Sequence, residues 1–303
     1  MDILGENYDG NEENLKLEKE FKFTPNNINN ILKNTAIVLQ GYATSKKQMF
    51  DIFTKYTTMG FTNIVISSYS SFIPDELLNK PFVIINDDIL GKYDRTNTII
   101  SKSSGANVNY QILTTKRGIE YITNNLNNVD YIVKLRADNF CHNLNLLVED
   151  WITAFKKFKS PLKHPFQKKI VTAGISGKYK PCWTILDYIS FGTTKDMYNL
   201  WNIPTTRKNN TRGEDYINTF YIIKYLSQKT ESEVENIMCN ERITQYSNSP
   251  KDYFIFDNRF CKKYLLYSYK PIPGLNSPGF RNSNQSCNAQ VGGVWKEMYC
   301  NLL

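Results

Sequence analysis

The feature that most constrains the fold is an alternation of short apolar runs with a segment of helical periodicity in the first third of the chain. Apolar runs at 35–41, 63–69 and 81–88 have the length and composition of buried strands. The segment 46–59, between the first two runs, carries apolar residues at helical spacing and is followed by Gly60, a helix stop. Because parallel strands need a crossover, which is usually a helix, this alternation predicts a parallel, Rossmann-like α/β sheet.

A fourth strand is predicted at 131–138, and its two faces differ. Because strand side chains alternate between faces, one face carries Ile132, Lys134, Arg136 and Asp138. A strand buried in a parallel sheet should be almost uniformly apolar, so these charges need an explanation. Open α/β sheets bind ligands at the carboxyl ends of their strands, which is a functional explanation. An edge strand in which Arg136 pairs with Asp138 is the structural alternative, and this stretch does not decide between them.

The rest of the chain shows weaker but recognisable periodicities. Helices are expected at 112–126, 144–158 and 213–226, and strands at 169–175, 184–191 and 253–256. Asn107 or Asn109 is expected to cap the helix before the fourth strand, and Thr193 forms a capping box with Asp196. The polar stretch 90–109 predicts a long loop over the carboxyl edge of the sheet, where such loops are often functional.

Composition narrows the classes of partner. The 37 Lys and Arg residues against 29 Asp and Glu give a formal charge of +8, which favours anionic partners such as phosphates. Six widely spaced cysteines, without a C-x-x-C pair, and two histidines argue against a zinc site or a disulfide framework. With no signal peptide and no apolar run long enough to span a membrane, we expect a cytoplasmic protein with at most peripheral membrane contact.

Several common functions lack their motifs. The chain has no Walker A run, no G-x-G-x-x-G and no G-x-S-x-G, which weighs against NTPases, dinucleotide oxidoreductases and α/β-hydrolases. The basic stretch 156–169 has no interleaved aromatic residues, and no helix-turn-helix or RNP pattern accompanies it. We therefore expect no nucleic-acid partner.

Carboxylates at strand ends are the first candidates for chemistry. Asp138 could hold Mg²⁺ or Mn²⁺, because these ions prefer oxygen ligands and bridge to substrate phosphates. Asp87 and Asp88, at the end of the third strand, could accept hydrogen bonds from a ribose or a base. A polar turn after a strand is the alternative explanation for this pair.

A phosphate site and a catalytic base are the next candidates. Residues 111–118 are predicted to form the first turns of a helix, whose free N–H groups and dipole attract phosphate, with Lys116 and Arg117 adding charge. Solvated cations on the surface of a helix are the more common alternative. Glu214 and Asp215 are predicted to open a helix and could present a base, although acidic residues are also expected there for the dipole. Asp187 is a rival base, because its apolar strand face would raise its pKa.

Several short motifs together resemble the WavE lipopolysaccharide-synthesis family in type and order. They are Ala36–Gln40, Asn109–Ile119, Tyr131–Asp138, Leu186–Gly192 and Gly213–Ile217. The resemblance extends over residues 35–226. It implies a glycosyltransferase with a GT-A-like fold, in which helices cover both faces of a mostly parallel central sheet.

Residues 1–30 are polar, acidic and without clear periodicity, so we expect them to form a leader. The resemblance implies that a single domain follows, with a nucleotide-sugar-binding half, 31–160, and an acceptor-binding half, 161–303, and it also implies which residues bind the donor. The acidic motif Arg136-Ala137-Asp138 is not a full Asp-x-Asp, so Arg136 or Lys134 could neutralise phosphate in place of a metal. Residues expected to bind the donor are Gln40, Ser67, Asp87, Gln111, Lys116, Lys134 and Arg136.

The implied reaction is an inverting transfer of a sugar from a nucleotide-sugar donor to a hydroxyl group of an oligosaccharide or glycolipid acceptor, such as a surface glycan or lipopolysaccharide. Mn²⁺ or Mg²⁺ is the expected cofactor, Glu214, Asp215 or Asp187 the expected base, and a monomer or homodimer the expected assembly. A sugar nucleotidyltransferase is one rival, but it should carry a Gly-rich loop after the first strand, where the chain offers only Gly41. A non-catalytic glycan-binding module is the other, and it would not need Asp138.

Overall fold

The computed structural model describes residues 25–89, 106–141, 144–157, 164–172, 188–206, 213–240, 253–256 and 266–268. Its helices are α2 (Pro25–Lys33), α3 (Lys46–Thr58), α4 (Ala106–Asn125), α5 (Leu144–Lys157), α6 (Thr194–Trp201), α7 (Gly213–Ser227) and α8 (Glu231–Asn240). Its strands are β1 (Thr35–Gln40), β2 (Asn63–Ser68), β3 (Val83–Ile85), β4 (Tyr131–Arg136), β5 (Asn139–Cys141), β6 (Ile170–Thr172), β7 (Ile189–Thr193), β8 (Phe254–Phe256) and β9 (Leu266–Ser268).

A mixed, mostly parallel sheet forms the centre of the protein. Seven strands hydrogen-bond in the order β3-β2-β1-β4-β7-β6-β8. The first four are parallel to one another, β7 is antiparallel to both β4 and β6, and β8 is parallel to β6. The predicted α/β class and mostly parallel sheet are confirmed, whereas the reversed direction of β7 was not predicted. Strands from both halves of the chain, before and after residue 160, contribute to this one sheet.

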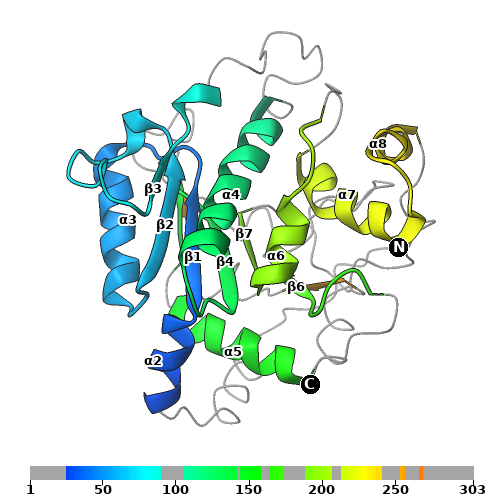
Figure 1. The fold of residues 1–303 in the computed structure, drawn as a ribbon. Coiled ribbons are helices and arrows are strands. Elements are labelled where there is room, and N and C mark those ends of the chain that lie inside the picture. Colours follow the sequence, from blue (N-terminus) through cyan, green and yellow to red (C-terminus); the bar gives the residue numbers. More distant parts are fainter. Residues whose placement is uncertain are drawn as a thin grey trace, which may run out of the picture.

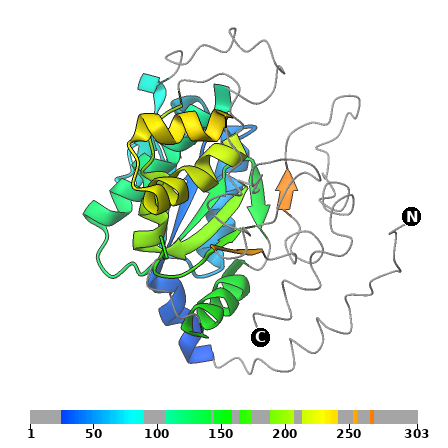
Figure 2. The ribbon, with the colours of Figure 1, turned by 90° about the vertical axis from the view of Figure 1, so that its right-hand side faces the viewer.

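Helices cover both faces of the sheet, as expected. One apolar core joins β1, β2 and β4 to α2, α3 and α5, and the other joins the same strands to α4, α6, α7 and α8. Figure 1 shows α4 and α6 side by side across the sheet, with α7 and α8 beyond them. Figure 2 shows that the small sheet of β5 and β9 lies on the side of the main sheet away from α7.

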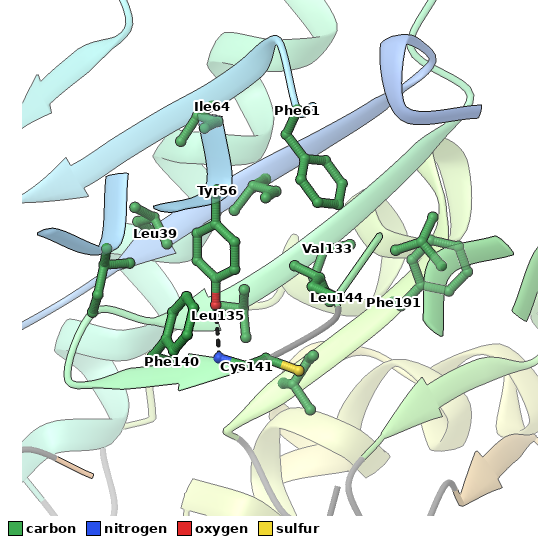
Figure 3. Close-up of a cluster of buried hydrophobic side chains, with 14 of the residues drawn as sticks. Leu39, Tyr56, Phe61, Ile64, Val133, Leu135, Phe140, Cys141, Leu144 and Phe191 are labelled. Atoms are coloured by element: carbon green, nitrogen blue, oxygen red, sulfur yellow. Dashed lines mark hydrogen bonds between the residues drawn. The ribbon is translucent and has the colours of Figure 1, made fainter. Parts of the chain in front are cut away.

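The chain that follows β4 is anchored in the first of these cores. The buried hydroxyl oxygen of Tyr56, on α3, accepts a hydrogen bond of 2.9 Å from the backbone N–H of Cys141 (Figure 3). The Tyr56 ring also packs against Phe61 and Phe140, with ring centroids 6.3 and 5.2 Å away. This contact holds β5 in place, and β5 begins directly after Asp138.

The predicted capping box is confirmed in part. Thr193 caps α6, and its hydroxyl accepts a hydrogen bond of 3.1 Å from the Asp196 N–H. The Asp196 carboxylate, however, accepts the backbone N–H groups of Gln167 and Lys168 at 2.7 and 2.8 Å. Burial raises the pKa of Asp196, because loss of solvent outweighs the hydrogen bonds that favour the charged form. Asp196 therefore ties α6 to the segment that leads into β6.

Helix boundaries differ from the sequence expectations in two places. Residues 25–30, assigned to the polar leader, are part of α2, which packs on β1 and α5. α4 begins at Ala106, so Asn107 and Asn109 lie inside the helix and neither is its N-cap. Both amide atoms of Asn109 instead bond the backbone of Thr206, at 2.8 and 2.9 Å. α8 and the β5–β9 pair were not predicted.

Candidate functional site

Three of the expected binding residues come together in one row at the carboxyl edge of the parallel strands. Gln40, the last residue of β1, is paired in register with Ser67 of β2 on one side and with Arg136 of β4 on the other. All three have the strand parity of Val38 and Val65, which pack against α4. The row therefore lies on the α4 face, at the edge where open α/β sheets bind ligands.

Hydrogen bonds join this row to α4. The side-chain amide of Gln40 donates to the Thr114 hydroxyl at 2.9 Å, and the Ser67 hydroxyl donates to the Thr114 carbonyl oxygen at 2.6 Å. Ser67 also accepts a bond of 3.0 Å from the buried amide of Asn86. Ser67 is fully buried, and its hydroxyl both donates and accepts a hydrogen bond within the protein. Its hydroxyl joins β2, α4 and the end of β3.

Gln40 differs from Ser67 because part of its amide is unused. Its side chain is buried, and its Oε1 atom has no hydrogen-bond partner among the described residues. A buried amide oxygen that lacks a donor is rare and costs free energy, so it calls for an explanation. A ligand donor, such as a ribose hydroxyl or a base N–H, would satisfy it.

A close approach between α4 and β1 makes these bonds possible. Gly118 faces β1, and a Cβ atom built on it would lie 2.5 Å from Cγ1 of Val38 and 3.4 Å from Cβ of Ser67. A glycine is required because even a Cβ atom does not fit in that gap. This contact sets the distance at which Thr114, one turn earlier, meets Gln40 and Ser67.

Arg136 and Asp138 form a two-pronged ion pair at the end of β4. Nε and Nη2 of Arg136 donate to the two carboxylate oxygens of Asp138 at 2.9 and 2.7 Å. The side-chain amide of Asn139 also donates to Asp138 Oδ1, at 2.9 Å. The guanidinium lies over the Tyr188 ring, 5.1 Å from its centroid. The Arg136 side chain is 25% exposed and that of Asp138 only 4%, so the cation faces solvent more than the carboxylate does.

This arrangement does not fit the expected metal ion. Both carboxylate oxygens of Asp138 accept hydrogen bonds, and each of them is bonded to the Arg136 guanidinium. Among the residues that the structure describes, no group of three His, Cys, Asp or Glu side chains is placed to hold a metal. The Arg136–Asp138 pair foreseen in the structural alternative is observed, but β4 lies between β1 and β7 and is not the edge strand that this alternative assumed.

Lys134 lies in the core rather than at the edge. Its side chain is fully buried on the α4 face of β4, and its ammonium lies 4.9 Å from the centroid of the Trp201 ring. A cation held over an indole face is attracted by the ring electrons. In this conformation Lys134 does not present its charge to solvent, and its expected contact with a phosphate stays a prediction.

The carboxylates after β3 have separate protein partners. Asp87 accepts hydrogen bonds from the backbone N–H of Ser70, at 2.9 Å, and from the Ser70 hydroxyl. Asp88 forms a two-pronged pair with Arg117 of α4, at 2.6 and 2.8 Å, and this hydrogen bonding raises the pKa of Arg117. Both carboxylates are exposed, so Asp87 remains accessible to a ligand at the end of β3.

The expected phosphate site on α4 is not at the start of the helix. Because α4 begins at Ala106, residues 111–118 lie in its middle, where backbone N–H groups are used within the helix. Lys116 points along the helix to Glu120, with Nζ 3.9 Å from Oε1. Gln111 is buried near the first turns. The helix-terminus argument therefore does not apply to Gln111 or Lys116.

The expected catalytic bases are only partly placed. Glu214 and Asp215 are the second and third residues of α7, which confirms the predicted helix start, but their side chains lie outside the described residues. Asp187 also lies outside them, immediately before Tyr188. Sequence reasoning missed the roles of Tyr188 and Asn139, although each adjoins a residue that had been singled out. Both residues could have been found from their position next to a candidate residue, whereas residue composition gave no indication of them.

The fold and this polar edge define an open-sheet α/β protein that can bind ligands at the carboxyl ends of its strands. No curated protein matches the chain significantly. Residues 83–252, more than half of the chain, match the family described as WavE lipopolysaccharide synthesis. The chain therefore belongs to the WavE family. β1 and β2 precede the matched region, which extends past residue 226 to residue 252.

No helix in the described part of the chain is long and apolar enough to cross a membrane.

Proposed function

We propose that the protein is a glycosyltransferase with a GT-A-like arrangement, which transfers a sugar from a nucleotide-sugar donor to a hydroxyl group of a lipopolysaccharide-like or other surface-glycan acceptor. The observation that carries the proposal is the row of Ser67, Gln40 and Arg136 at the carboxyl edge of the parallel strands, inside a chain of the WavE family. A nucleoside diphosphate needs polar groups for its base and ribose and a positive charge for its phosphates, and this edge offers both.

The reaction requires two groups from the protein, a positive charge near the leaving group and a base for the acceptor hydroxyl. The bond between the anomeric carbon and the diphosphate oxygen breaks with its electron pair moving to the diphosphate, so a fixed positive charge near that oxygen lowers the barrier. The acceptor hydroxyl forms the new bond to the anomeric carbon and gives its proton to a carboxylate. Arg136 serves the first need. Glu214, Asp215 or Asp187 serves the second, and attack from the face opposite the leaving group inverts the anomeric centre.

Ligand binding by the full-length protein is the first test. A panel of nucleoside diphosphates and nucleotide sugars is screened by thermal shift, with and without Mn²⁺. A ligand at one hundred times its Kd stabilises the folded state by about 2.7 kcal/mol, which raises the melting temperature by several degrees. If no nucleotide raises the melting temperature and no nucleotide sugar is hydrolysed, the proposal is wrong.

Product analysis separates this function from its rivals. A glycosyltransferase releases nucleoside diphosphate from a nucleotide sugar, whereas a sugar nucleotidyltransferase releases pyrophosphate from a nucleoside triphosphate and a sugar phosphate. A glycan-binding module releases neither and binds glycans without a nucleotide. The stretch after β1 contains Gly41 and then Tyr42, with no Gly-rich, basic loop, and this favours the glycosyltransferase over the nucleotidyltransferase.

A further inference from the structure

We infer that Asp138 is a positioning residue for Arg136, and that Arg136, in place of a divalent cation, contacts the diphosphate of the donor. This inference rests on the proposed function and specifies how its donor site handles phosphate charge. It assigns the acidic residue at the end of β4 a role different from metal ligation.

The geometry of the pair supports a positioning role. Arg136 is held by two parallel hydrogen bonds to Asp138, and Asp138 is held in turn by the side-chain amide of Asn139. The Tyr188 ring supports the flat face of the guanidinium. An arginine fixed in this way loses little conformational entropy when it meets a planar or tetrahedral oxyanion, so its orientation is prepared before binding.

Exposure decides which member of the pair a ligand meets first. Asp138 is almost wholly buried, while a quarter of the Arg136 side chain remains accessible. A diphosphate that approaches this edge therefore meets a cation, and a divalent metal ion meets the same cation. For the metal ion to ligate Asp138, it would have to displace the guanidinium against like-charge repulsion and break two charge-assisted hydrogen bonds.

The position of Arg136 in the sheet places it beside other donor-binding candidates. It is the register partner of Gln40, and its backbone N–H bonds the Tyr188 carbonyl oxygen at 3.2 Å. The guanidinium thus lies at the edge between the parallel strands and the antiparallel β7. A nucleoside bound near Gln40 would bring its diphosphate toward β4, where the Arg136 side chain is partly exposed and Lys134 is buried.

Metal dependence of nucleotide binding is the direct test on the wild-type protein. Affinity for the nucleoside diphosphates UDP, GDP, CDP and ADP is measured by titration calorimetry in EDTA, and again in Mn²⁺ or Mg²⁺. We expect the preferred diphosphate to bind in EDTA with an affinity within about threefold of that in metal. Binding that requires the metal would overturn the inference but leave the proposed function intact. Absence of binding in every buffer would overturn both.

Three variants test the role of each residue in EDTA. Arg136→Gln is expected to weaken diphosphate binding at least tenfold, which corresponds to about 1.4 kcal/mol, while the affinity for the unphosphorylated nucleoside stays unchanged. Arg136→Lys keeps the charge but loses the fork, and it should recover only part of that loss. Asp138→Asn should weaken binding in EDTA as well, because Arg136 is no longer oriented. The matched control is Lys224→Gln, which removes one cation, paired with Glu231 of α8, from the last turn of α7 and should bind normally.

The Asp138→Asn variant separates positioning from metal ligation. A positioning residue predicts weaker binding in EDTA and no recovery with Mn²⁺, whereas a metal ligand predicts unchanged binding in EDTA and loss of a metal-stimulated increase. The second pattern would overturn the inference. Melting temperatures identify variants that fail to fold, and in that case the wild-type comparison with and without metal still decides the question.

Discussion

Replacing Gly118 by alanine is expected to destabilise the protein, even though alanine is the better helix former. Gly118 lies inside α4 and faces the centre of β1. A Cβ atom at this position would lie 2.5 Å from Cγ1 of Val38, whereas ordinary contact begins at 3.4 Å. Val38 has little freedom to move, because it is fully buried and its β-branched side chain has a restricted χ1 angle. The helix must therefore shift away from the sheet.

Two opposing free energies set the size of this effect. Alanine is favoured over glycine in a helix interior by about 1 kcal/mol. Forcing one extra carbon into a well-packed core costs about 1–3 kcal/mol. The net expectation is a loss of about 1 kcal/mol in the free energy of unfolding. The shift of α4 should also lengthen the bond between Gln40 and Thr114, now 2.9 Å, and so weaken nucleotide binding.

Urea denaturation followed by circular dichroism measures this loss. Thr123→Ala is the matched control, because Thr123 is an exposed residue of the same helix, and its substitution should stabilise the protein by no more than about 0.7 kcal/mol through helix propensity. In a Val38→Ala background the clashing atom is absent, so Gly118→Ala should become neutral or stabilising, and a double-mutant cycle would show the coupling. If Gly118→Ala stabilises the wild-type protein by the full helix-propensity term, the close approach is not real and the reasoning fails.

Three further substitutions test contacts that hold the fold around the site. Tyr56→Phe removes the acceptor of the Cys141 N–H and should cost about 1–3 kcal/mol, with faster exchange of that amide hydrogen. Asn109→Ala removes the side chain that bonds two backbone groups of Thr206 and should cost a similar amount, about 1–3 kcal/mol in urea denaturation; no change would contradict the described link between α4 and the segment that follows α6. Burial raises the pKa of Asp196 in the folded state, so the stability from its neutral form is present in acid and is lost as the pH rises through that raised pKa. Asp196→Asn should therefore cost more stability in acid than in neutral buffer, and an equal cost at both would refute the shift.

Much of the fold was predictable because its elements carry local patterns. The apolar runs that become β1 and β2, and the helical spacing before Gly60, depend on neighbours a few residues apart. The alternation of charged and apolar residues in β4 also survives in the structure, where Val133 and Leu135 face one core and Ile132 faces the other. These features follow from the regular repeat of side-chain direction along each helix and strand.

The candidate site was predictable only in part. The sequence indicated that the ends of β1, β2 and β4 would carry Gln40, Ser67 and Arg136, and pairing in register brings these residues together. It did not indicate that Lys134 would be buried over Trp201, a residue of α6. That contact depends on how a distant helix packs, which no local pattern records.

By itself, the sequence determined the class of fold and the polar character of the sheet edge, because both depend on residue types at short spacing, and its short motifs, taken in order, resembled the family. Only the tertiary structure decided that β7 runs antiparallel, that α4 approaches β1 closely enough to require Gly118, and that Arg136 rather than Asp138 faces solvent. These features arise from contacts between segments far apart in the chain, or from the burial those contacts impose. The difference in exposure between Arg136 and Asp138 decides which charge a ligand meets.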